Sequence, residues 1–202
     1  PVESGFSTGR DYETERFGLA RANALGVQAP RLAAAGTMED RYRFDYLVMT
    51  YVPGRELEAV RYTLSDAEKA RIGRELRAFV RRMDTPCEAF PARALRLPAA
   101  EARWTCFPDT FRAARAAYLA RAAYGAPVYI HGDLTGDNIL LAPGGGICVI
   151  DYADALTAPP EVELACVLCE AFHLEKPYLA GFFGAYDPAA LAEACLAGLL
   201  LH

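Results

Sequence analysis

The segment of eight residues from His131 to Asn138 constrains this chain more than any other part of the sequence. It reads HGDLTGDN and follows a short β-forming stretch at 128–130, so the sequence predicts a loop that begins where a strand ends. Two further β-forming stretches lie at 139–141 and 147–150, and the three consecutive glycines between them indicate the turn of a hairpin. The sequence therefore predicts a small β unit that fixes the polar residues of the loop at one edge of its hairpin.

Three side chains of this unit, those of Asp133, Asn138 and Asp151, have the chemistry needed to act together on a phosphoryl group. Asn138 and Asp151 carry the oxygen ligands that Mg²⁺ prefers, and the predicted hairpin brings them to the same edge. Asp133 is a carboxylate that suits the acceptance of a proton from a hydroxyl. We interpret Asp133 as the candidate catalytic base, and Asn138 with Asp151 as candidate metal ligands. His131 is interpreted as a hydrogen-bonded support for the loop.

The rest of the chain alternates helical and β-forming patterns without an internal repeat, which is typical of an α+β fold. A proline and a glycine at 53–54 interrupt the pattern and predict a boundary between two lobes, 1–53 and 54–202. A serine and a glutamate at 65 and 68 form a capping-box signature at the start of one helix. The predicted helices are 11–25, 65–83, 109–124, 161–173 and a last one from Pro188, and the predicted strands before the boundary are 31–35 and 44–52.

The composition is that of a globular protein and disfavours several kinds of partner. The chain has 202 residues, of which 53% are hydrophobic and 23% charged, so it can bury a core in one domain or two small lobes. Its six cysteines are scattered through apolar segments, which favours reduced thiols and a cytoplasmic location. The net charge of −5 arises in 157–202, where six acids meet one base. This excess disfavours nucleic acid and suits a cationic small substrate, although a solvated helical face explains it equally well. No run is apolar and long enough to predict a membrane partner.

The motif at 131–138, followed by Ile150-Asp151, resembles the catalytic and metal-binding loops of the aminoglycoside phosphotransferase family. The members of that family are small-molecule kinases with a protein-kinase-like fold. The stretch YLVMTYVPG at 46–54 resembles the family's hinge, and matching pieces run from Glu15 to about Cys169. The resemblance implies a two-lobed kinase-like fold, ATP and Mg²⁺ as cofactors, and a small molecule as the partner.

The same resemblance implies roles for residues outside the motif. Glu15 corresponds to the helix glutamate that pairs with a phosphate-binding lysine, and the nearby Glu13 is an alternative. Glu163 falls where the family often has an aspartate that bonds to the catalytic loop. Backbone contacts to a nucleotide base leave no side-chain signature, so GTP stays open beside ATP. The hinge that would bind the base is formed by Thr50, Tyr51 and Val52.

Two departures from protein kinases bear on the substrate and on the phosphate site. Only residues 153–160 separate Asp151 from the next predicted helix, which leaves no room for an activation segment and favours a small-molecule acceptor over a protein. No lysine precedes Lys69, and no glycine-rich phosphate loop precedes Glu15. Either the N-lobe in this sequence is incomplete, or the triphosphate is held in another way. The first residue is Pro1 and not Met, so we expect an incomplete N-lobe.

Two hypotheses from different classes follow from the sequence. The first is a phosphotransferase that moves the γ-phosphate of ATP to a hydroxyl of a small molecule, with a cationic compound such as an aminoglycoside and a metabolite both as candidates. The alternative is a catalytically inactive, kinase-like protein that binds nucleotide or serves as a scaffold. A lysine on a strand before Glu15 would favour the enzyme.

Overall fold

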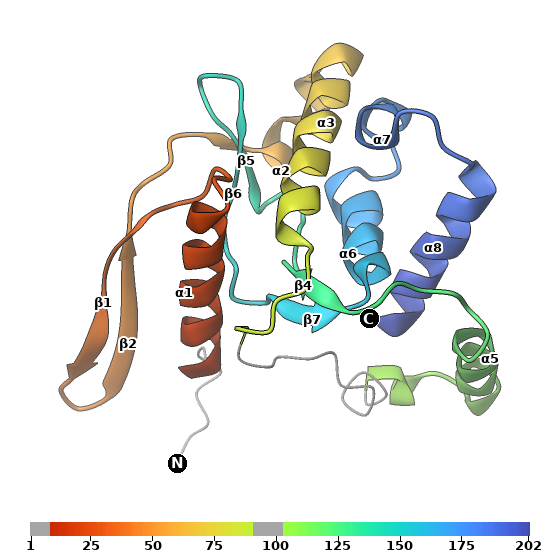
Figure 1. The fold of residues 1–202 in the computed structure, drawn as a ribbon, viewed down its shortest axis with the longest axis horizontal. Helices are drawn as coiled ribbons and strands as arrows, with labels where there is room; N and C mark the ends of the chain where they lie inside the picture. The colour runs from red at the N-terminus through yellow and green to blue at the C-terminus, as the bar shows by residue number, and fades with distance from the viewer. Residues whose placement is uncertain (1–8, 91–102) are drawn as a thin grey trace.

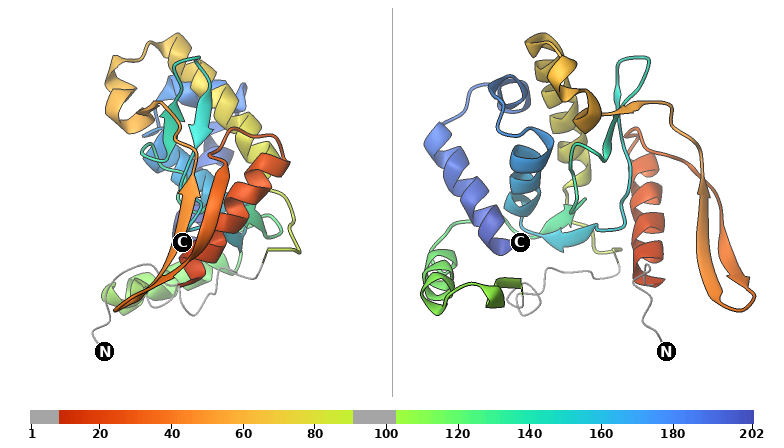
Figure 2. Two further views of the ribbon diagram at one scale, coloured as in Figure 1. Left: turned by 90° about the vertical axis from the view of Figure 1, so that its left-hand side faces the viewer. Right: turned by 180° about the vertical axis from the view of Figure 1, so that it is seen from behind.

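The computed structural model describes residues 9–90 and 103–202, and it has the predicted α+β architecture. A long β-hairpin and one helix form a small part at one side of the molecule, and a mostly helical part with short strands lies beside them (Figure 1). The views in Figure 2 show that the hairpin extends away from the helical part, with the first helix between the two. The division into lobes at 53–54 stays a prediction.

The N-terminal part consists of helix α1 (Gly9–Ala24) and the antiparallel strands β1 (Leu32–Glu39) and β2 (Arg43–Met49). The helix ends at Ala24, one residue before the predicted Leu25, and Gly26 follows with a φ of 66°, in the left-handed region that glycine tolerates. Strand β1 extends beyond the predicted 31–35 to Glu39, because pairing with β2 brings Gly36 and Glu39, both of low β-propensity, into the ladder. Strand β2 ends before the predicted residue 52.

The β unit around the motif has the predicted order of strand, loop and hairpin. β4 (Val128–Ile130) delivers the loop, and β5 (Ile139–Leu141) pairs with β6 (Ile147–Val149) across the glycine turn. Two strands that the sequence did not predict complete the ladders, because they are too short to show an alternating pattern. These are β3 (Arg55–Glu56), which pairs with β5, and β7 (Leu156–Ala158), which pairs with β4.

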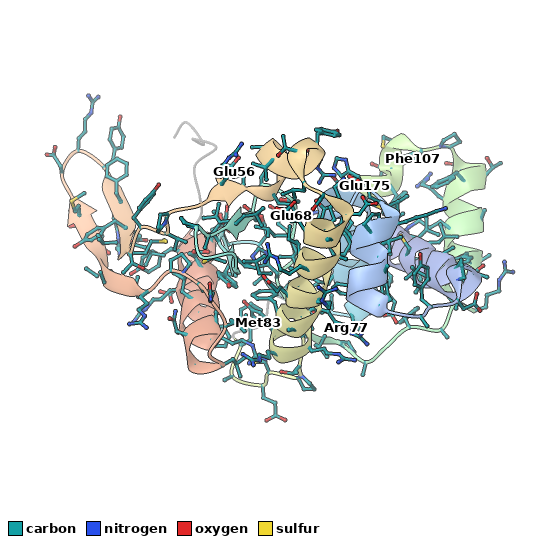
Figure 3. All side chains as sticks on the ribbon, turned by 90° about the horizontal axis from the view of Figure 1, so that it is seen from above. Glu56, Glu68, Arg77, Met83, Phe107 and Glu175 are labelled. Carbon is teal, nitrogen blue, oxygen red and sulfur yellow. The ribbon has the colours of Figure 1, made fainter. Side chains whose placement is uncertain are left out.

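Helix α3 (Asp66–Met83) is the longest helix in the described part of the chain. Ser65 and Glu68 form the predicted capping box at its start, with both reciprocal hydrogen bonds present. Figure 3 labels Glu68 and Met83 near its two ends. α3 packs closely against α7 (Lys176–Phe183). Glycine permits this approach, because a Cβ on Gly181 would lie 2.0 Å from the backbone oxygen of Ala70.

Two of the predicted helices differ from the observed ones. α5 (Asp109–Leu119) ends five residues before the predicted residue 124. The predicted helix 161–173 is α6 (Pro160–Cys166) followed by a π-helical turn at Val167–Ala171, and His173 and Leu174 then adopt positive φ angles. The remaining helical elements of the described residues are α2 (Leu57–Val60), α8 (Pro188–Leu201) and the 3₁₀ turns Arg61–Thr63 and Trp104–Cys106.

The hydrophobic core joins α1 to the β unit and to the C-terminal helices. Its buried members include Leu19 of α1, Leu76 of α3, Tyr152 after β6 and Phe172 after the π turn. α1 reaches this core through Gly18, where a Cβ would lie 2.3 Å from the Cβ of Tyr152. Within the described residues, no single helix has the length and apolarity of a membrane span, and α7 with α8 reaches them only as a pair bent by 95°.

The contact between α3 and α7 makes a testable prediction about stability. In an exposed helix, Gly→Ala stabilises the helix by about 1 kcal/mol. At Gly181, however, the new methyl group would clash with the backbone of Ala70, which cannot move aside. We expect Gly181→Ala to lower the free energy of unfolding by about 1–3 kcal/mol, measured by denaturant titration. Gly144→Ala is the matched control, because nothing lies within 4 Å of its Cβ position. Equal stability of the two variants would contradict this packing.

Candidate active site

Asp133 and Asn138 are joined by direct hydrogen bonds across the motif loop. The amide Nδ2 of Asn138 donates to the backbone carbonyl of Asp133 at 2.9 Å and to its carboxylate Oδ2 at 2.8 Å. Asn138 is buried and Asp133 is half-buried, so the bonds are shielded from water and hold the carboxylate in one orientation. Because the amide nitrogen faces Asp133, the amide oxygen of Asn138 is the atom that remains to bind a metal.

Asp151 lies at the same edge of the β5–β6 hairpin. The ladder pairs Ile139 with Val149, and beyond it the N–H of Ile150 donates to the backbone oxygen of Asn138 at 3.1 Å. Asp151 is the next residue; it is exposed, and its φ of 62° turns the chain away from the strand direction. The structure thus brings together the three side chains that the sequence singled out for the catalytic and metal roles.

Four carboxylates share this small region and affect one another's charge. Burial raises the pKa of the Asp133 carboxyl, and the negative charge of Asp154 raises it further. The hydrogen bond from Asn138 lowers that pKa, whereas Asp151 and Asp137 raise it. Three neighbouring carboxylates therefore raise the pKa of Asp133, and a concentration of negative charge of this kind favours the binding of a cation.

The donor set fits Mg²⁺ better than a metal that prefers an all-protein site. Among the described residues, no group of three or more His, Cys, Asp or Glu side chains is arranged to hold a metal ion. Mg²⁺ usually takes only one or two carboxylates from the protein and completes its shell with water and phosphate oxygens. The Asn138 amide oxygen and the Asp151 carboxylate suit that requirement.

His131 connects the motif loop to the segment that carries Asp151. Its ring is fully buried; Nδ1 accepts from the N–H of Asp133 at 3.3 Å, and Nε2 lies 3.1 Å from the backbone oxygen of Ile150. Since Nδ1 accepts, the proton of the neutral ring is on Nε2. Burial lowers the pKa of His131 to about 4, so the ring stays neutral at pH 7. These contacts match the supporting role that the sequence predicts for His131.

Glu163 of α6 forms hydrogen bonds to the backbone at the beginning of the motif loop. Its two carboxylate oxygens accept from the backbone N–H groups of His131 and Gly132, both at 3.0 Å, and the residue is 1% exposed. Burial raises its pKa to about 7. The longer glutamate side chain therefore makes the loop contact that the family often makes with an aspartate. Gly132 has no room for a side chain, because a Cβ would lie 2.3 Å from the backbone oxygen of Asp154.

Glu15 and Glu13 of α1 have different environments. Glu13 is exposed, whereas Glu15 is 9% exposed and its carboxylate accepts a hydrogen bond from the backbone N–H of Tyr152. Burial raises the pKa of Glu15 to about 7, and the nearby charge of Asp151 acts in the same direction. Glu15 therefore adjoins the segment that carries Asp151, and its contact to Tyr152 links α1 to that segment.

The predicted hinge lies between β2 and β3. Both the N–H and the hydroxyl oxygen of Thr50 are engaged with the backbone of Arg31, at 2.9 Å each. Tyr51 is 86% exposed and Val52 is half-buried. Within the predicted hinge, Thr50 is therefore held by hydrogen bonds to Arg31, whereas Tyr51 and Val52 are more accessible to a ligand.

Sequence reasoning missed Glu58 and Arg61, which support the motif loop at Gly136. The N–H of Glu58 donates to the backbone oxygen of Gly136 at 3.1 Å, and its carboxylate lies 2.8 Å from the fully buried Arg61 guanidinium. Arg61 also donates to the backbone oxygen of Ala171 at 2.8 Å. A glutamate and an arginine three residues apart were the only signal, and such pairs are common on exposed helices.

The fold and the candidate site together are those of a small-molecule kinase, and comparisons with known proteins give the same class. The model of the phosphotransferase enzyme family APH matches residues 9–199. The chain therefore belongs to this phosphotransferase family. A comparison with curated protein sequences gave no match.

Three solved structures illustrate the likeness of the fold. Aminoglycoside 2'-phosphotransferase-IIIa, in its GDP complex, is 19% identical with a TM-score of 0.66, and the match covers 95% of this chain and 73% of that one. Aminoglycoside phosphotransferase APH(3'')-Id from Streptomyces rimosus, in complex with ADP and streptomycin, is 20% identical with a TM-score of 0.61, over 95% and 82%. Choline kinase LicA from Streptococcus pneumoniae is 14% identical with a TM-score of 0.61, over 97% and 73%.

The buried carboxylate of Glu15 makes a prediction about pH. The pKa of Glu15 is about 7 in the folded chain, against an ordinary value of 4.5. Between pH 4.5 and 7 the folded state therefore keeps a proton on Glu15 that the unfolded state has already lost. The contribution of Glu15 to stability therefore falls as pH rises from about 4.5 to 7. Glu15→Gln removes this titration. The free energy of unfolding of the variant should therefore rise relative to that of the wild type by about 3 kcal/mol over that window, measured by denaturant titration at each pH.

Glu13→Gln is the matched control for this measurement, because Glu13 lies two positions away and is exposed. The difference between that variant and wild type should not change with pH. A flat difference for Glu15→Gln as well would show that Glu15 titrates at its ordinary pKa.

Proposed function

We propose that this protein transfers the γ-phosphate of ATP to a hydroxyl of a small molecule. The observation that carries the proposal is the arrangement of Asp133, Asn138 and Asp151 at one hairpin edge. Membership of a phosphotransferase family supports the same reaction class. Two structural neighbours contain GDP or ADP, which supports use of a nucleotide as the donor.

In this mechanism Asp133 orients the acceptor hydroxyl and accepts its proton at a carboxylate oxygen. The raised pKa of Asp133 favours this role, because a more basic carboxylate takes a proton more readily. Asn138 fixes the rotamer of Asp133 through its Nδ2 and is left with its amide oxygen for Mg²⁺. Asp151 supplies the charged ligand. When bound, Mg²⁺ would neutralise phosphate charge and orient the phosphates for in-line transfer.

The nucleotide base is assigned to the hinge, where backbone groups of Tyr51 and Val52 are the candidates for hydrogen bonds to adenine. Thr50 contributes indirectly, because its bonds to Arg31 fix the hinge to the residue that precedes β1. Glu15 is assigned to the nucleotide side of the site, where it positions the segment that carries Asp151 through its bond to Tyr152.

The acceptor is proposed to be a cationic small molecule. Three other carboxylates raise the negative potential around Asp133, and a protonated amine would be attracted there. Aminoglycosides and choline, which are named with the structural neighbours, are both cationic. The six free cysteines in the structure agree with the proposed cytoplasmic location.

A catalytically inactive nucleotide-binding protein is the second candidate. It is favoured by the hydrogen bond that the Glu15 carboxylate accepts from the backbone N–H of Tyr152, because that bond already engages the group that the kinase would use to pair with a lysine. One assay separates the two candidates: ADP or GDP release from ATP or GTP in the presence of kanamycin, streptomycin, choline and neutral sugars. Release that depends on one acceptor supports the kinase, whereas nucleotide binding without release with any of them supports the inactive protein.

Removing the proposed base should abolish transfer without affecting nucleotide binding. Asp133→Asn keeps the shape of the side chain and an oxygen for the bond from Asn138, but it cannot accept a proton. We expect the rate of phosphoryl transfer to fall by about 100-fold or more, with nucleotide affinity within about twofold of wild type. Asp137→Asn in the same loop is the control and should lose less than about tenfold. An equal loss in both variants, or a parallel loss of nucleotide affinity, would contradict the assigned role.

Removing the proposed charged ligand should affect nucleotide binding only when Mg²⁺ is present. Asp151→Asn replaces a negative oxygen ligand by a neutral one, so the Mg²⁺ complex of the nucleotide should bind about tenfold more weakly. Affinity without Mg²⁺ should be unchanged or higher, because a repulsive charge is removed. Calorimetric titration with ATP at several Mg²⁺ concentrations measures both, and an affinity that is unaltered throughout would exclude Asp151 as a ligand.

A further inference from the structure

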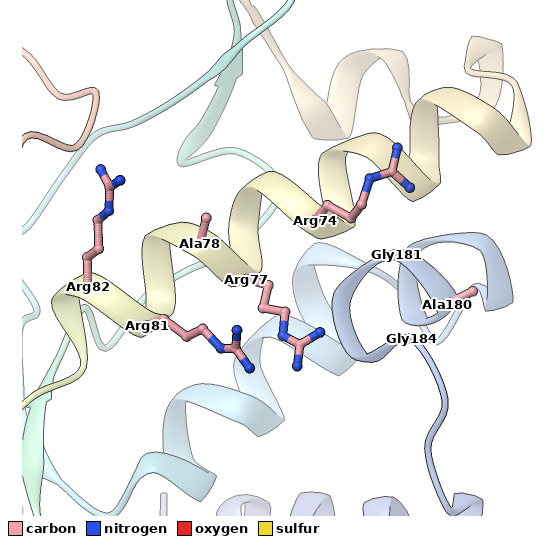
Figure 4. Close-up of a pocket in the computed structure, with 8 residues that line it drawn as sticks. All are labelled: Arg74, Arg77, Ala78, Arg81, Arg82, Ala180, Gly181 and Gly184. Atoms are coloured by element: carbon pink, nitrogen blue, oxygen red, sulfur yellow. The ribbon is translucent and has the colours of Figure 1, made fainter.

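A groove lined by arginine lies between α3 and the end of α7, away from the motif loop. It has a volume of about 530 Å³, and none of its lining residues belongs to the candidate active site. Figure 4 shows the groove with its lining residues drawn as sticks. They are Arg74, Arg77, Ala78, Arg81 and Arg82 of α3, with Ala180, Gly181 and Gly184 at the end of α7.

The groove arises from the way in which the two helices meet and separate. Gly73 and Gly181 let the backbones touch, since a Cβ on Gly73 would lie 2.3 Å from the backbone oxygen of Tyr178. α7 then ends at Phe183, and Gly184, with a φ of 70°, turns the chain away. The last turns of α3 therefore continue beyond the end of α7. Their arginine side chains line a groove whose other lining residues are small.

The arginines of the groove lack acidic partners in the described part of the chain. No carboxylate oxygen of the described residues is recorded within 4.0 Å of the guanidinium groups of Arg74, Arg77, Arg81 or Arg82. Arg77 donates only weakly to the backbone oxygen of Phe183, at 3.4 Å. Earlier on the same helix, Lys69 and Arg71 are each paired with a glutamate, so the contrast is local.

Arg77 and Arg81 are the pair on which the inference depends. They are four residues apart and therefore project from the same face of α3, as Figure 4 shows. Two like charges at this spacing repel each other and destabilise the helix unless an anion lies between or beside them. The chain as a whole has a net charge of −5, so this pair of positive charges without an acidic partner among the described residues is a local exception to the overall charge.

We propose that this groove binds a small soluble anion that carries two or more linked phosphate groups. Guanidinium groups form paired, charge-assisted hydrogen bonds with phosphate oxygens, and several arginines on one helix face can contact several phosphates. The volume falls in the range of small-molecule sites. The concave shape and the negative net charge disfavour a flat membrane surface or a nucleic acid as the ligand. The proposal is independent of the catalytic function.

Binding of tripolyphosphate tests the proposal directly. Calorimetric titration in EDTA at constant ionic strength suppresses the candidate active site, which requires Mg²⁺. We expect saturable binding by the wild-type chain that is weakened at least tenfold in Arg77→Gln/Arg81→Gln. The matched control is Arg41→Gln/Arg43→Gln on the exposed hairpin, which removes the same charge elsewhere and should bind like wild type.

Two measurements keep the test decisive. Arg81 is exposed, so the single variant Arg81→Gln should fold normally and still bind more weakly, which separates lost binding from lost structure. Sedimentation with phosphatidylcholine vesicles, with and without phosphatidylinositol bisphosphate, tests a lipid headgroup as the source of phosphate. Absent tripolyphosphate binding, equal weakening in both double variants, or binding to the vesicles alone would each overturn the proposal.

Discussion

The buried carboxylate of Glu163 is the contact on which the geometry of the site depends. It accepts from two successive N–H groups, of His131 and Gly132, just where the chain leaves β4 and enters the loop. Peptide groups buried there without a partner would cost about 1–3 kcal/mol each, and the glutamate satisfies both with one side chain. His131, held by this contact, then reaches across to the backbone of Ile150. One anchor on α6 thus fixes the loop of Asp133 and, through His131, the segment that carries Asp151.

Electrostatic repulsion within the site is tolerated because this scaffold is rigid. Asp133 would move away from the other carboxylates if it were on a free loop, but Asn138 holds its carboxylate and Glu58 holds the backbone of Gly136. The result is a concentration of negative charge that attracts cations, whether a divalent metal or an amine. The same logic with the opposite sign applies at the arginine groove, where the packing of α3 on α7 holds like charges near each other.

Much of the fold could be predicted from local patterns. The capping box at Ser65 and Glu68 and the glycine turn between β5 and β6 are local signals, and both are confirmed. The helix predicted over 161–173 is present from Pro160 to Ala171, but its last turn is π-helical, which helical periodicity does not distinguish from an α-helix. Strands β3 and β7 were missed because a strand of two or three residues exists only through its partner.

The sequence by itself determined the family to which the chain belongs, and the types and spacing of Asp133, Asn138 and Asp151 predicted phosphoryl transfer as the reaction class. Only the tertiary structure decided that Glu15, and not Glu13, is the buried glutamate of α1. It also decided that the Arg61 side chain is fully buried and bonded to the backbone of Ala171. The physical reason is that spacing along a chain specifies neighbours on one element. Burial and pKa shifts arise instead from atoms that folding brings together from distant parts of the sequence.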